Sequence, residues 1–530
     1  MQSTVSETGL TRRQERFILF GLLVGVFAEA LESSIVYPAL PSMGRLLPGS
    51  SAWMAWVYGA YLLPITALTP IYGRLSDVYG RLPLYTWGIV LFMLGSILSG
   101  FSTSLPMLVA FRCIQGVGAG ALMPIAIIIG RTVFPMSKRG QVQGIIAMSF
   151  GIAAALGPAL GGFVTKTLSW HWLFFLNVPF CIASLSLMYL FLPMSARHNP
   201  DRPQNFQVDW LGALTLIIGS GSLMLALTWI GKSDHGTVSL RSIIALATSL
   251  LGFVLFLLAE RRHPQPMVPL HLFRRKVFSL CALGGFFAGG LMLSVNMHLP
   301  LYMQEVFHVN EAQSGMFVTP MILSTVVGSF LGGRLLGRKI KKYKWMAVFS
   351  SGVMLMGLGL LSIVQPDTTL WKVVFAGGVF GCGMGISFPL YGTVIGQQVE
   401  PKQLGAAFGL LAFSRSLGGA VSSALFGSLF IRKFDHVFTL QLKQLLPVDV
   451  LATLPLQRFA EPHFRSEWIT SHKEALPAVC AALEKSSFLG HAQAIHRVFV
   501  VACLVAGASL LVSALLPNER IDLTGRPTGR

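Results

Sequence analysis

Two carboxylates inside an apolar stretch are the residues of this chain that could most readily do chemistry. Glu29 and Glu32 lie within the apolar segment 17–40, and their spacing of three places them on one face of a helix. Burial disfavours the charged form of a carboxyl group, and a second carboxylate nearby disfavours it further. At least one of the two is therefore expected to take up a proton near neutral pH, as a proton-coupling site requires. The alternative is a structural pair that bonds to its neighbours.

Arg112, in the apolar segment 105–130, is the natural charge partner of these acids. A guanidinium in the middle of a bilayer costs at least about 2.5–3.5 kcal/mol, so it needs an acid, carbonyl groups or water. A helix-packing clamp is the alternative role for Arg112. Arg415 raises the same question later in the chain, with packing and substrate contact both open. Asn296 and Tyr302 are further candidate contacts for a substrate.

The composition indicates which elements hold these residues. Of the 530 residues, 53% are hydrophobic and only 12% are charged, whereas a soluble domain carries about 25% charged residues. Soluble enzymes, disordered chains and fibrous repeats are excluded for this reason. A net charge of +19 would indicate a nucleic-acid partner in a soluble protein. Here the cations flank apolar runs, so they indicate orientation in a membrane and no nucleic acid.

Fourteen segments are long and apolar enough to cross a bilayer, which takes roughly 20 apolar residues each. The chain is therefore predicted to be an all-α membrane protein with 14 transmembrane helices. The predicted spans are 17–40, 52–72, 84–103, 105–130, 141–164, 173–193, 210–230, 242–259, 277–299, 314–336, 346–365, 372–396, 405–430 and 497–516. With both termini in the cytoplasm, most Lys and Arg of the short loops lie on the inner side, as the positive-inside rule requires.

Two parts of the chain repeat each other. The pattern G-x-G-x-G-x3-P occurs at 116–124 and again at 381–389, and the tripeptide at 73–75 is echoed at 333–335. Such duplication is typical of carriers, which bind substrate between two halves and alternate access. Three domains are predicted: a six-helix N-terminal lobe at 1–196, a two-helix insert with a basic connector at 197–276, and a pseudo-symmetric six-helix C-terminal lobe at 277–530 with an outer loop at 431–496.

The loop 73–81 is predicted to act as a hinge and a charge latch. Gly73 and Gly80 permit a tight turn, and Asp77 can pair with a nearby cation, for which Arg131 is the candidate; Arg81 ends the loop. A latch of this kind would favour one access state. A plain cationic anchor at the membrane surface is the alternative.

Gly157 and Pro158 are predicted to break the helix of segment 141–164, because proline lacks an N–H and clashes with the preceding turn. The neighbouring glycines are expected to allow close approach to the opposite lobe. A kink without a further role is the alternative.

Several motifs resemble the major facilitator superfamily. The loop 73–81 is similar to its cytoplasmic signature G-x-L-a-D-r-x-G-r, and 108–120 to its fourth-helix motif. Gly151 with 157–162 resembles the fifth-helix motif of its drug/proton antiporters. Residues 31–41 are similar to a sequence run of the fourteen-helix multidrug branch of these antiporters. In that run, Glu32 occupies the position where an Asp is usual. The resemblance implies proton transfer at Glu32 and Arg112. It also implies a leak-preventing seal at Gly151, Gly157, Pro158, Gly161 and Gly162.

The expected function is a proton-coupled antiporter that exports lipophilic drugs or metabolites, with cations as one option, across a bacterial cytoplasmic (inner) membrane by alternating access. The alternative is a proton-coupled carrier for one physiological solute, working by export or symport. The proton gradient would supply the energy, with no cofactor, and six Cys without a CxxC pair predict no metal site. No HExxH, G-x-S-x-G or phosphate-loop motif occurs, so an enzyme is not expected.

The expected partners are a small lipophilic substrate, protons and the lipid bilayer. The outer loop 431–496 alternates apolar and charged residues, which predicts an outer amphipathic helix or pair. This loop is expected to act as a lid, and a docking site for a periplasmic adaptor protein is the alternative.

Overall fold

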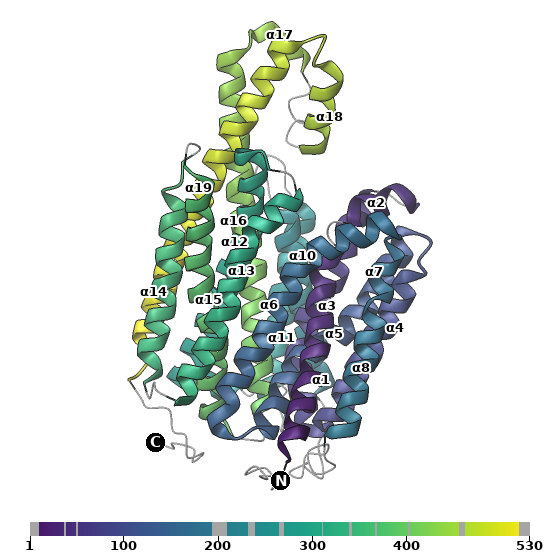
Figure 1. Cartoon of the computed structure of the whole chain (residues 1–530), viewed down its shortest axis with the longest axis vertical. Helices are drawn as coiled ribbons and strands as arrows, with labels where there is room; N and C mark the ends of the chain where they lie inside the picture. Colours follow the sequence, from purple (N-terminus) through teal and green to yellow (C-terminus); the bar gives the residue numbers. More distant parts are fainter. Residues whose placement is uncertain are drawn as a thin grey trace.

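The regular structure of the chain is helical throughout the part that is described. The computed structural model describes residues 10–36, 39–48, 51–192, 209–231, 239–263, 270–309, 311–338, 342–365, 368–400, 403–454 and 462–518. In the N-terminal half, the helices are α1 (Arg12–Ile35), α2 (Leu40–Leu46), α3 (Ser51–Tyr79), α4 (Arg81–Gly100), α5 (Leu105–Val133), α6 (Met136–Thr167), α7 (His171–Phe175) and α8 (Asn177–Phe191). Figure 1 shows them as one group on one side of the bundle.

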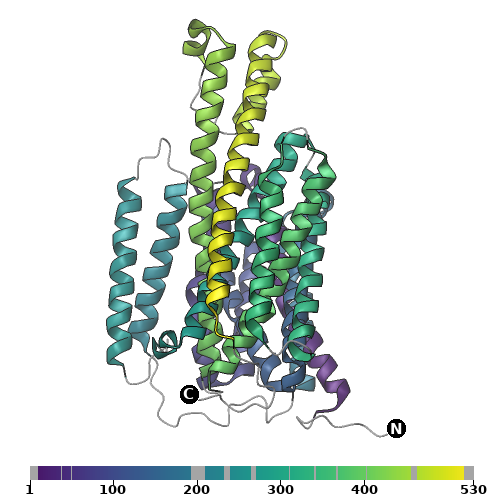
Figure 2. The same ribbon diagram turned by 90° about the vertical axis from the view of Figure 1, so that its left-hand side faces the viewer.

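The middle and the C-terminal half contribute the remaining helices. They are α10 (Trp210–Gly231), α11 (Leu240–Arg262), the 3-10 helix η3 (Leu270–Arg274), α12 (Lys276–Phe307), α13 (Glu311–Arg338), α14 (Tyr343–Ser362), α15 (Leu370–Gln398), α16 (Leu404–Leu445), α17 (Val448–Thr453), α18 (Pro462–His472) and α19 (Pro477–Leu515). Helices α10 and α11 pack together as a hairpin beside the bundle, against α16 and α3 (Figure 2). Helix α1 begins and α19 ends at the same end of the bundle, which we call the terminal end; the opposite end is the distal end.

Twelve helices in the described ranges are long and apolar enough to cross a membrane: α1, α4, α5, α7 with α8, α10 to α16, and α19. Fourteen were expected. The other two predicted segments, 52–72 and 141–164, lie in α3 and α6, which are 29 and 32 residues long but are not among the twelve. The first predicted segment is too long at its end, because α1 stops at Ile35.

The two G-x-G-x-G repeats take equivalent places in the two halves. In α5, Gly116 and Gly120 lie against the backbone of α3, while Gly118 lies against α4. In α15, Gly381 and Gly385 lie against α13, while Gly383 lies against α14. A Cβ atom at Gly383 would approach the Met354 nitrogen to 2.6 Å, closer than side chains are found. Each repeat thus lets one helix pack closely between two others, as small residues do in membrane bundles.

Helices α16 and α19 continue well beyond the bundle at the distal end (Figures 1 and 2). They have 42 and 39 residues, and a helix of 40 residues is about 60 Å long, twice the hydrocarbon thickness of a bilayer. Their distal parts, with α17 and α18, form what we call the extension (431–454 and 462–496), which has a small apolar core of its own. The predicted outer amphipathic helices are therefore mainly continuations of two spans.

Charged residues attach the extension to the bundle. Glu305 at the distal end of α12 lies 3.9 Å from Nη2 of Arg465 in α18 and 3.4 Å from Nδ1 of His491 in α19. The Arg465 guanidinium also lies over the Phe434 ring, at 5.4 Å. Burial lowers the pKa of Arg465, and the nearby Glu305 opposes that effect. The cluster joins α12, α16, α18 and α19 at one point.

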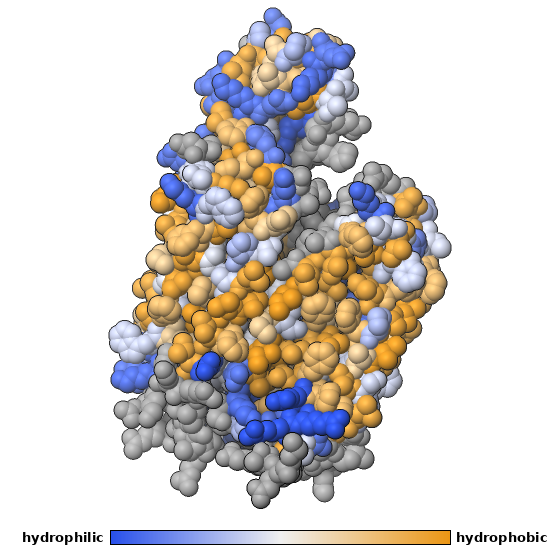
Figure 3. All heavy atoms as spheres, in the orientation of Figure 1, coloured by the Kyte–Doolittle hydropathy of each residue, from blue (hydrophilic) through white to orange (hydrophobic). Residues whose placement is uncertain are grey.

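The two halves meet closely at the terminal end. Helix α3 packs against α16 and α6 against α13. A Cβ atom at Gly140 of α6 would lie 2.7 Å from the Gly333 carbonyl oxygen of α13, so the close approach requires a glycine. Gly73 of α3 faces the Gly405 backbone of α16 in the same way. At the distal end, by contrast, the surface is hollowed between the extension and the N-terminal half (Figure 3).

Candidate functional site

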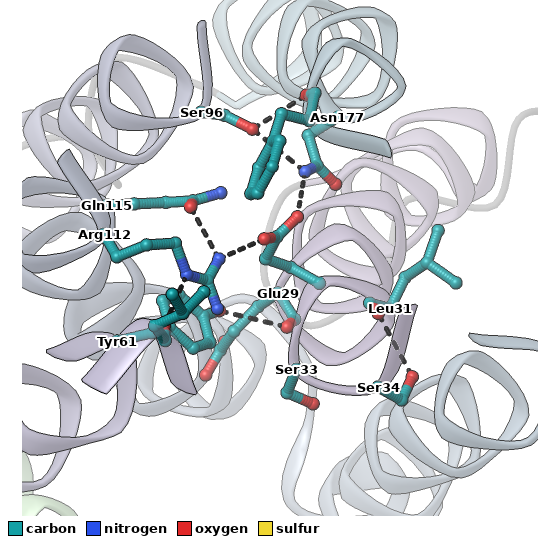
Figure 4. Close-up of polar contacts among 12 residues, drawn as sticks. Glu29, Leu31, Ser33, Ser34, Tyr61, Ser96, Arg112, Gln115 and Asn177 are labelled. Atoms are coloured by element: carbon teal, nitrogen blue, oxygen red, sulfur yellow. Dashed lines mark hydrogen bonds and ion pairs between the residues drawn. The ribbon is translucent and has the colours of Figure 1, made fainter. Parts of the chain in front are cut away.

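A buried ion pair joins α1 to α5 in the interior of the N-terminal half. Arg112 Nη1 donates to Glu32 Oε1, and both side chains are 0% exposed. The predicted pairing of Arg112 with an acid of α1 is therefore confirmed, and Glu32 is that acid. Arg112 Nη1 also donates to Gln115 Oε1 at 2.8 Å, and Nε donates to the Val57 carbonyl oxygen at 3.1 Å (Figure 4).

Asn177 holds the second oxygen of the Glu32 carboxylate. Its Nδ2 donates to Glu32 Oε2 and, at 3.0 Å, to Ser96 Oγ of α4. Figure 4 shows Asn177 and Arg112 reaching into the same polar cluster from different helices. The carboxylate thus has a charged donor on one oxygen and an amide donor on the other. Neither Asn177 nor Gln115 was predicted as a site residue, although Gln115 is three residues from Arg112 on the same helix.

Aromatic rings complete the surroundings of Arg112. The guanidinium lies 4.2 Å from the centroid of the Tyr61 ring and 5.7 Å from that of Phe174. A cation over a ring face is attracted by about 2 kcal/mol when both are removed from water. The Tyr61 hydroxyl donates to the backbone oxygen of Glu29 at 3.2 Å. Tyr61 therefore connects the Arg112 guanidinium to the backbone of α1 at Glu29, a role for which the sequence had no signal.

Glu29 is separate from the ion pair. Its side chain is buried, at 7% exposure, and lies within hydrogen-bond reach of the Met123 backbone of α5. Its Oε2 has no hydrogen-bond partner among the described residues. The two acids share one helix face as predicted, yet only Glu32 has a cationic partner at close range. Glu29 is a poorly satisfied buried carboxyl one turn closer to the terminal end.

A small cavity between the two halves, which we call the central cavity, has a volume of about 30 Å³. It is lined by α5, α6, α15 and α16 through Met123, Ile127, Gln143, Ile146, Ala147, Phe388, Gly392, Phe408, Leu411 and Arg415. Arg415 lies over the Phe388 ring, 4.2 Å from its centroid, and Gln143 Oε1 accepts from Thr393 Oγ1 at 3.1 Å. Its volume is enough for one or two water molecules.

The three predicted substrate contacts lie in different surroundings. Arg415 lines the central cavity. Asn296 is exposed on α12. Tyr302 is 2% exposed in the core of the C-terminal half, against the ring of Phe307 at 5.7 Å. The structure thus brings only Arg415 to the space between the halves, because Tyr302 points from α12 toward its own half.

The loop 73–81 connects the two halves, but not through the predicted partners. Asp77 Oδ1 accepts from the backbone N–H of Gly405 at 3.2 Å, in the first turn of α16, where N–H groups lack partners within the helix. Arg131 instead donates through Nη1 to the Gly392 carbonyl oxygen of α15 at 2.8 Å, with Phe408 below it. The expected Asp77–Arg131 pair is replaced by two separate contacts with the other half.

The remaining loop residues have local roles. Gly80 has φ of 93°, a conformation that L side chains rarely adopt, and it makes the turn from α3 into α4. The cations whose charges act on Asp77 are Arg74 and Arg81. The predicted tight turn is therefore located at Gly80, while Gly73 lies in the helix and makes the close contact with Gly405.

The glycines of α6 differ from the prediction. The helix continues through Gly157 and Pro158 to Thr167, so it is not interrupted there. Gly157 and Gly161 face Ser34 and Ile35 of α1, in their own half rather than the opposite one. Gly151 does face the opposite half, because a Cβ atom there would lie 3.1 Å from the Val326 side chain of α13. A Cβ atom at Gly162 would have nothing within 4 Å.

Comparisons with known proteins agree with this architecture. The family profile of the Major Facilitator Superfamily matches residues 22–423. Multidrug resistance protein 3 of Bacillus subtilis is 32% identical over 445 residues, which cover 83% of this chain and 84% of that protein. Multidrug transporter protein MdtP of the same species is 31% identical over 443 residues, covering 83% and 79%. The structure of the proton:xylose symporter XylE superposes with a TM-score of 0.58 at 12% identity, covering 95% and 96%, which shows a shared fold alone.

Proposed function

The chain belongs to the major facilitator superfamily of multi-pass membrane transporters, and we propose that it is a proton-coupled antiporter that exports lipophilic drugs or metabolites by alternating access. Its relatives among the multidrug transporters support the export of such solutes. The observation that carries the proton coupling is the fully buried Glu32–Arg112 pair. Intramembrane acids of this kind mark ion paths.

Protonation of Glu32 would remove the charge that binds α1 to α5. Arg112 would then keep its acceptors on Val57 and Gln115, so the guanidinium is not left without partners. Losing the whole partner of a buried ion pair costs about 3–5 kcal/mol, and these retained contacts reduce that cost. The site can therefore hold and release a proton while the bundle stays folded.

A route of contacts links this site to the interface between the halves. Less than one turn after Glu32, Ser34 and Ile35 of α1 lie against Gly157 and Gly161 of α6. Helix α6 in turn meets α13 of the other half. A small shift of α1 that follows protonation would therefore be passed to the helix that closes the terminal end. This is how proton uptake would favour one access state over the other.

We assign the terminal end to the cytoplasm and propose that fourteen helices, α3 and α6 included, cross a bacterial cytoplasmic membrane. The structure would then be the outward-facing state, because the halves meet at the terminal end and the distal surface is hollowed. One proton entering down a potential of 100 mV yields about 2.3 kcal/mol. That free energy concentrates a neutral solute roughly 50-fold, and no bound cofactor or metal takes part. The extension would act as a lid on the outer side.

Transport in everted vesicles tests the proposal. Dye uptake is measured with and without an imposed pH gradient for the wild type, Glu32→Gln and a matched control, Glu484→Gln, whose carboxylate is exposed on the extension. We expect gradient-driven transport in the wild type and the control, and its loss in Glu32→Gln. Unchanged coupling in Glu32→Gln, at equal protein levels, would remove Glu32 from the mechanism. Equal transport after a protonophore would refute proton coupling altogether.

A further inference from the structure

The central cavity contains a cation that the proton site does not use. Of its described lining residues, Arg415 alone is charged, Gln143 supplies an amide, and none is acidic. Arg112, which also lies in the interior of the bundle, is neutralised by Glu32. Glu29 lies beside the Met123 backbone but is not among the lining residues. The charge that faces the space between the halves is therefore positive.

Arg415 has unused hydrogen-bonding capacity. No hydrogen bond or ion pair joins its guanidinium to the described residues, and Nε is buried without a partner. Stacking on Phe388 covers the face of the guanidinium and leaves the N–H groups at its edge. Those groups form a planar fork that matches a carboxylate with two parallel hydrogen bonds.

A second cation, Arg131, lies behind the lining of the cavity. Arg131 donates to the carbonyl oxygen of Gly392 and lies over the ring of Phe408, at 4.9 Å, and both of these residues line the cavity. Two guanidinium groups in a medium of low dielectric produce a positive potential across several ångströms. An anion is attracted to this space and a cation is repelled.

We propose, on the basis of the antiport function above, that the central cavity binds the anionic group of a lipophilic weak acid at Arg415. Aliphatic and aromatic side chains, among them Phe388, Phe408 and Leu411, form the rest of the lining and suit a flat apolar body. The preferred cargo is thus an aromatic or aliphatic carboxylate rather than a lipophilic cation.

The central cavity is too small in this conformation to hold the cargo, so the cargo binds in another access state. About 30 Å³ is far below the roughly 300–1,000 Å³ of a site for a drug-sized molecule. Because the lining comes from α5 and α6 of one half and α15 and α16 of the other, separating the halves at the terminal end enlarges it. The cargo enters from that side, and closure of the halves expels it.

Export of an anion changes the electrical driving force. When one proton enters and one monovalent anion leaves, two positive charges move inward in effect, whereas one moves for a neutral cargo and none for a monovalent cation. A potential of 100 mV is worth about 50-fold in concentration per charge. The same potential would therefore support an outside-to-inside concentration ratio of roughly 2,500 for the anion and about 50 for a neutral analogue.

Equilibrium binding tests the proposal without any gradient. The full chain in nanodiscs is titrated by calorimetry with 1-naphthoate, 1-naphthamide and trimethyl-1-naphthylammonium, which share a ring system and differ in charge. We expect the wild type to bind the carboxylate at least 10-fold more tightly than the amide and the cation least. A charged hydrogen bond is worth about 10- to 150-fold in affinity. Equal or tighter binding of the cation, or no binding of naphthoate at millimolar concentration, overturns the proposal.

Variants test whether Arg415 causes the preference for the carboxylate probe. Arg415→Gln should abolish the preference for the carboxylate over the amide, while Arg415→Lys should keep part of it. The control Arg261→Gln removes an exposed cation from the end of α11 and should change nothing. An unchanged preference in Arg415→Gln overturns the assignment, and if that variant does not fold, the wild-type probe series still decides. If the proposed proton coupling is wrong, Glu32→Gln will leave transport in vesicles unchanged. The affinities of the three naphthyl probes for the wild type do not depend on that result.

Discussion

Replacing Gly140 by alanine should shift the protein away from the conformation described above. The added Cβ would lie 2.7 Å from the Gly333 carbonyl oxygen of α13, whereas ordinary contacts begin at about 3.4 Å. Both groups belong to backbone in packed helices, so neither can move independently. Overpacking of this kind costs about 1–3 kcal/mol. The cost applies only when the halves meet at the terminal end, so the ratio of molecules with that end open to those with it closed should rise roughly 5- to 150-fold.

The same helix provides a matched control. Gly162→Ala places its Cβ where nothing lies within 4 Å, and both substitutions add the same helix propensity, about 1 kcal/mol relative to glycine. Electron–electron double resonance measures the distance between spin labels attached at positions 138 and 334, where Lys138 and Arg334 are exposed at the terminal end. We expect the distribution for Gly140→Ala to move to longer distances and that of Gly162→Ala to match the wild type.

Three results would contradict this reasoning. An unchanged distribution in Gly140→Ala would show that the contact with Gly333 does not limit closure. An equal shift in Gly162→Ala would mean that helix propensity, not steric overlap, drives the change. A reduced free energy of unfolding with no shift in distance would mean that the overlap is absorbed within one half.

Three further predictions concern other contacts. Asn177→Ala should lower the free energy of unfolding by about 1.5–3 kcal/mol, the value of a hydrogen bond to a charged group, and should impair gradient-driven transport. The control is Asn296→Ala, at an exposed position. Equal melting temperatures and equal transport in the two variants would contradict the role of Asn177. Arg112→Ala should cost about 3–5 kcal/mol, because it leaves a buried carboxylate unpaired; thermal melting in detergent measures this, and a variant as stable as the wild type would refute it. Arg465→Gln should increase the rate of amide hydrogen exchange in the extension, whereas Lys473→Gln, at an exposed position, should not. Equal exchange rates in the two variants would show that the Glu305 cluster does not attach the extension to the bundle.

The amino-acid sequence alone determined the helical architecture, the repeat and the central ion pair. Apolar runs of about 20 residues must be helical in lipid, because every backbone polar group has to be satisfied within the segment. The G-x-G-x-G clusters marked the helices that pack most closely in each half. The pairing of Arg112 with an acid of the first helix followed from charge, since a buried arginine needs an acid and few acids occur at that depth, while the structure identified that acid as Glu32.

Only the tertiary structure decided which neighbour each helix face meets. Asp77 and Arg131, for example, both contact the other half rather than each other, and Gly157 faces α1 rather than the opposite lobe. Periodicity identifies a face of a helix, but lipid tails are as apolar as leucine, so hydrophobicity does not distinguish lipid from another helix as the neighbour of that face. The partners of Tyr61 and Asn177 come from helices distant in sequence. Their positions therefore depended on packing that no local pattern records.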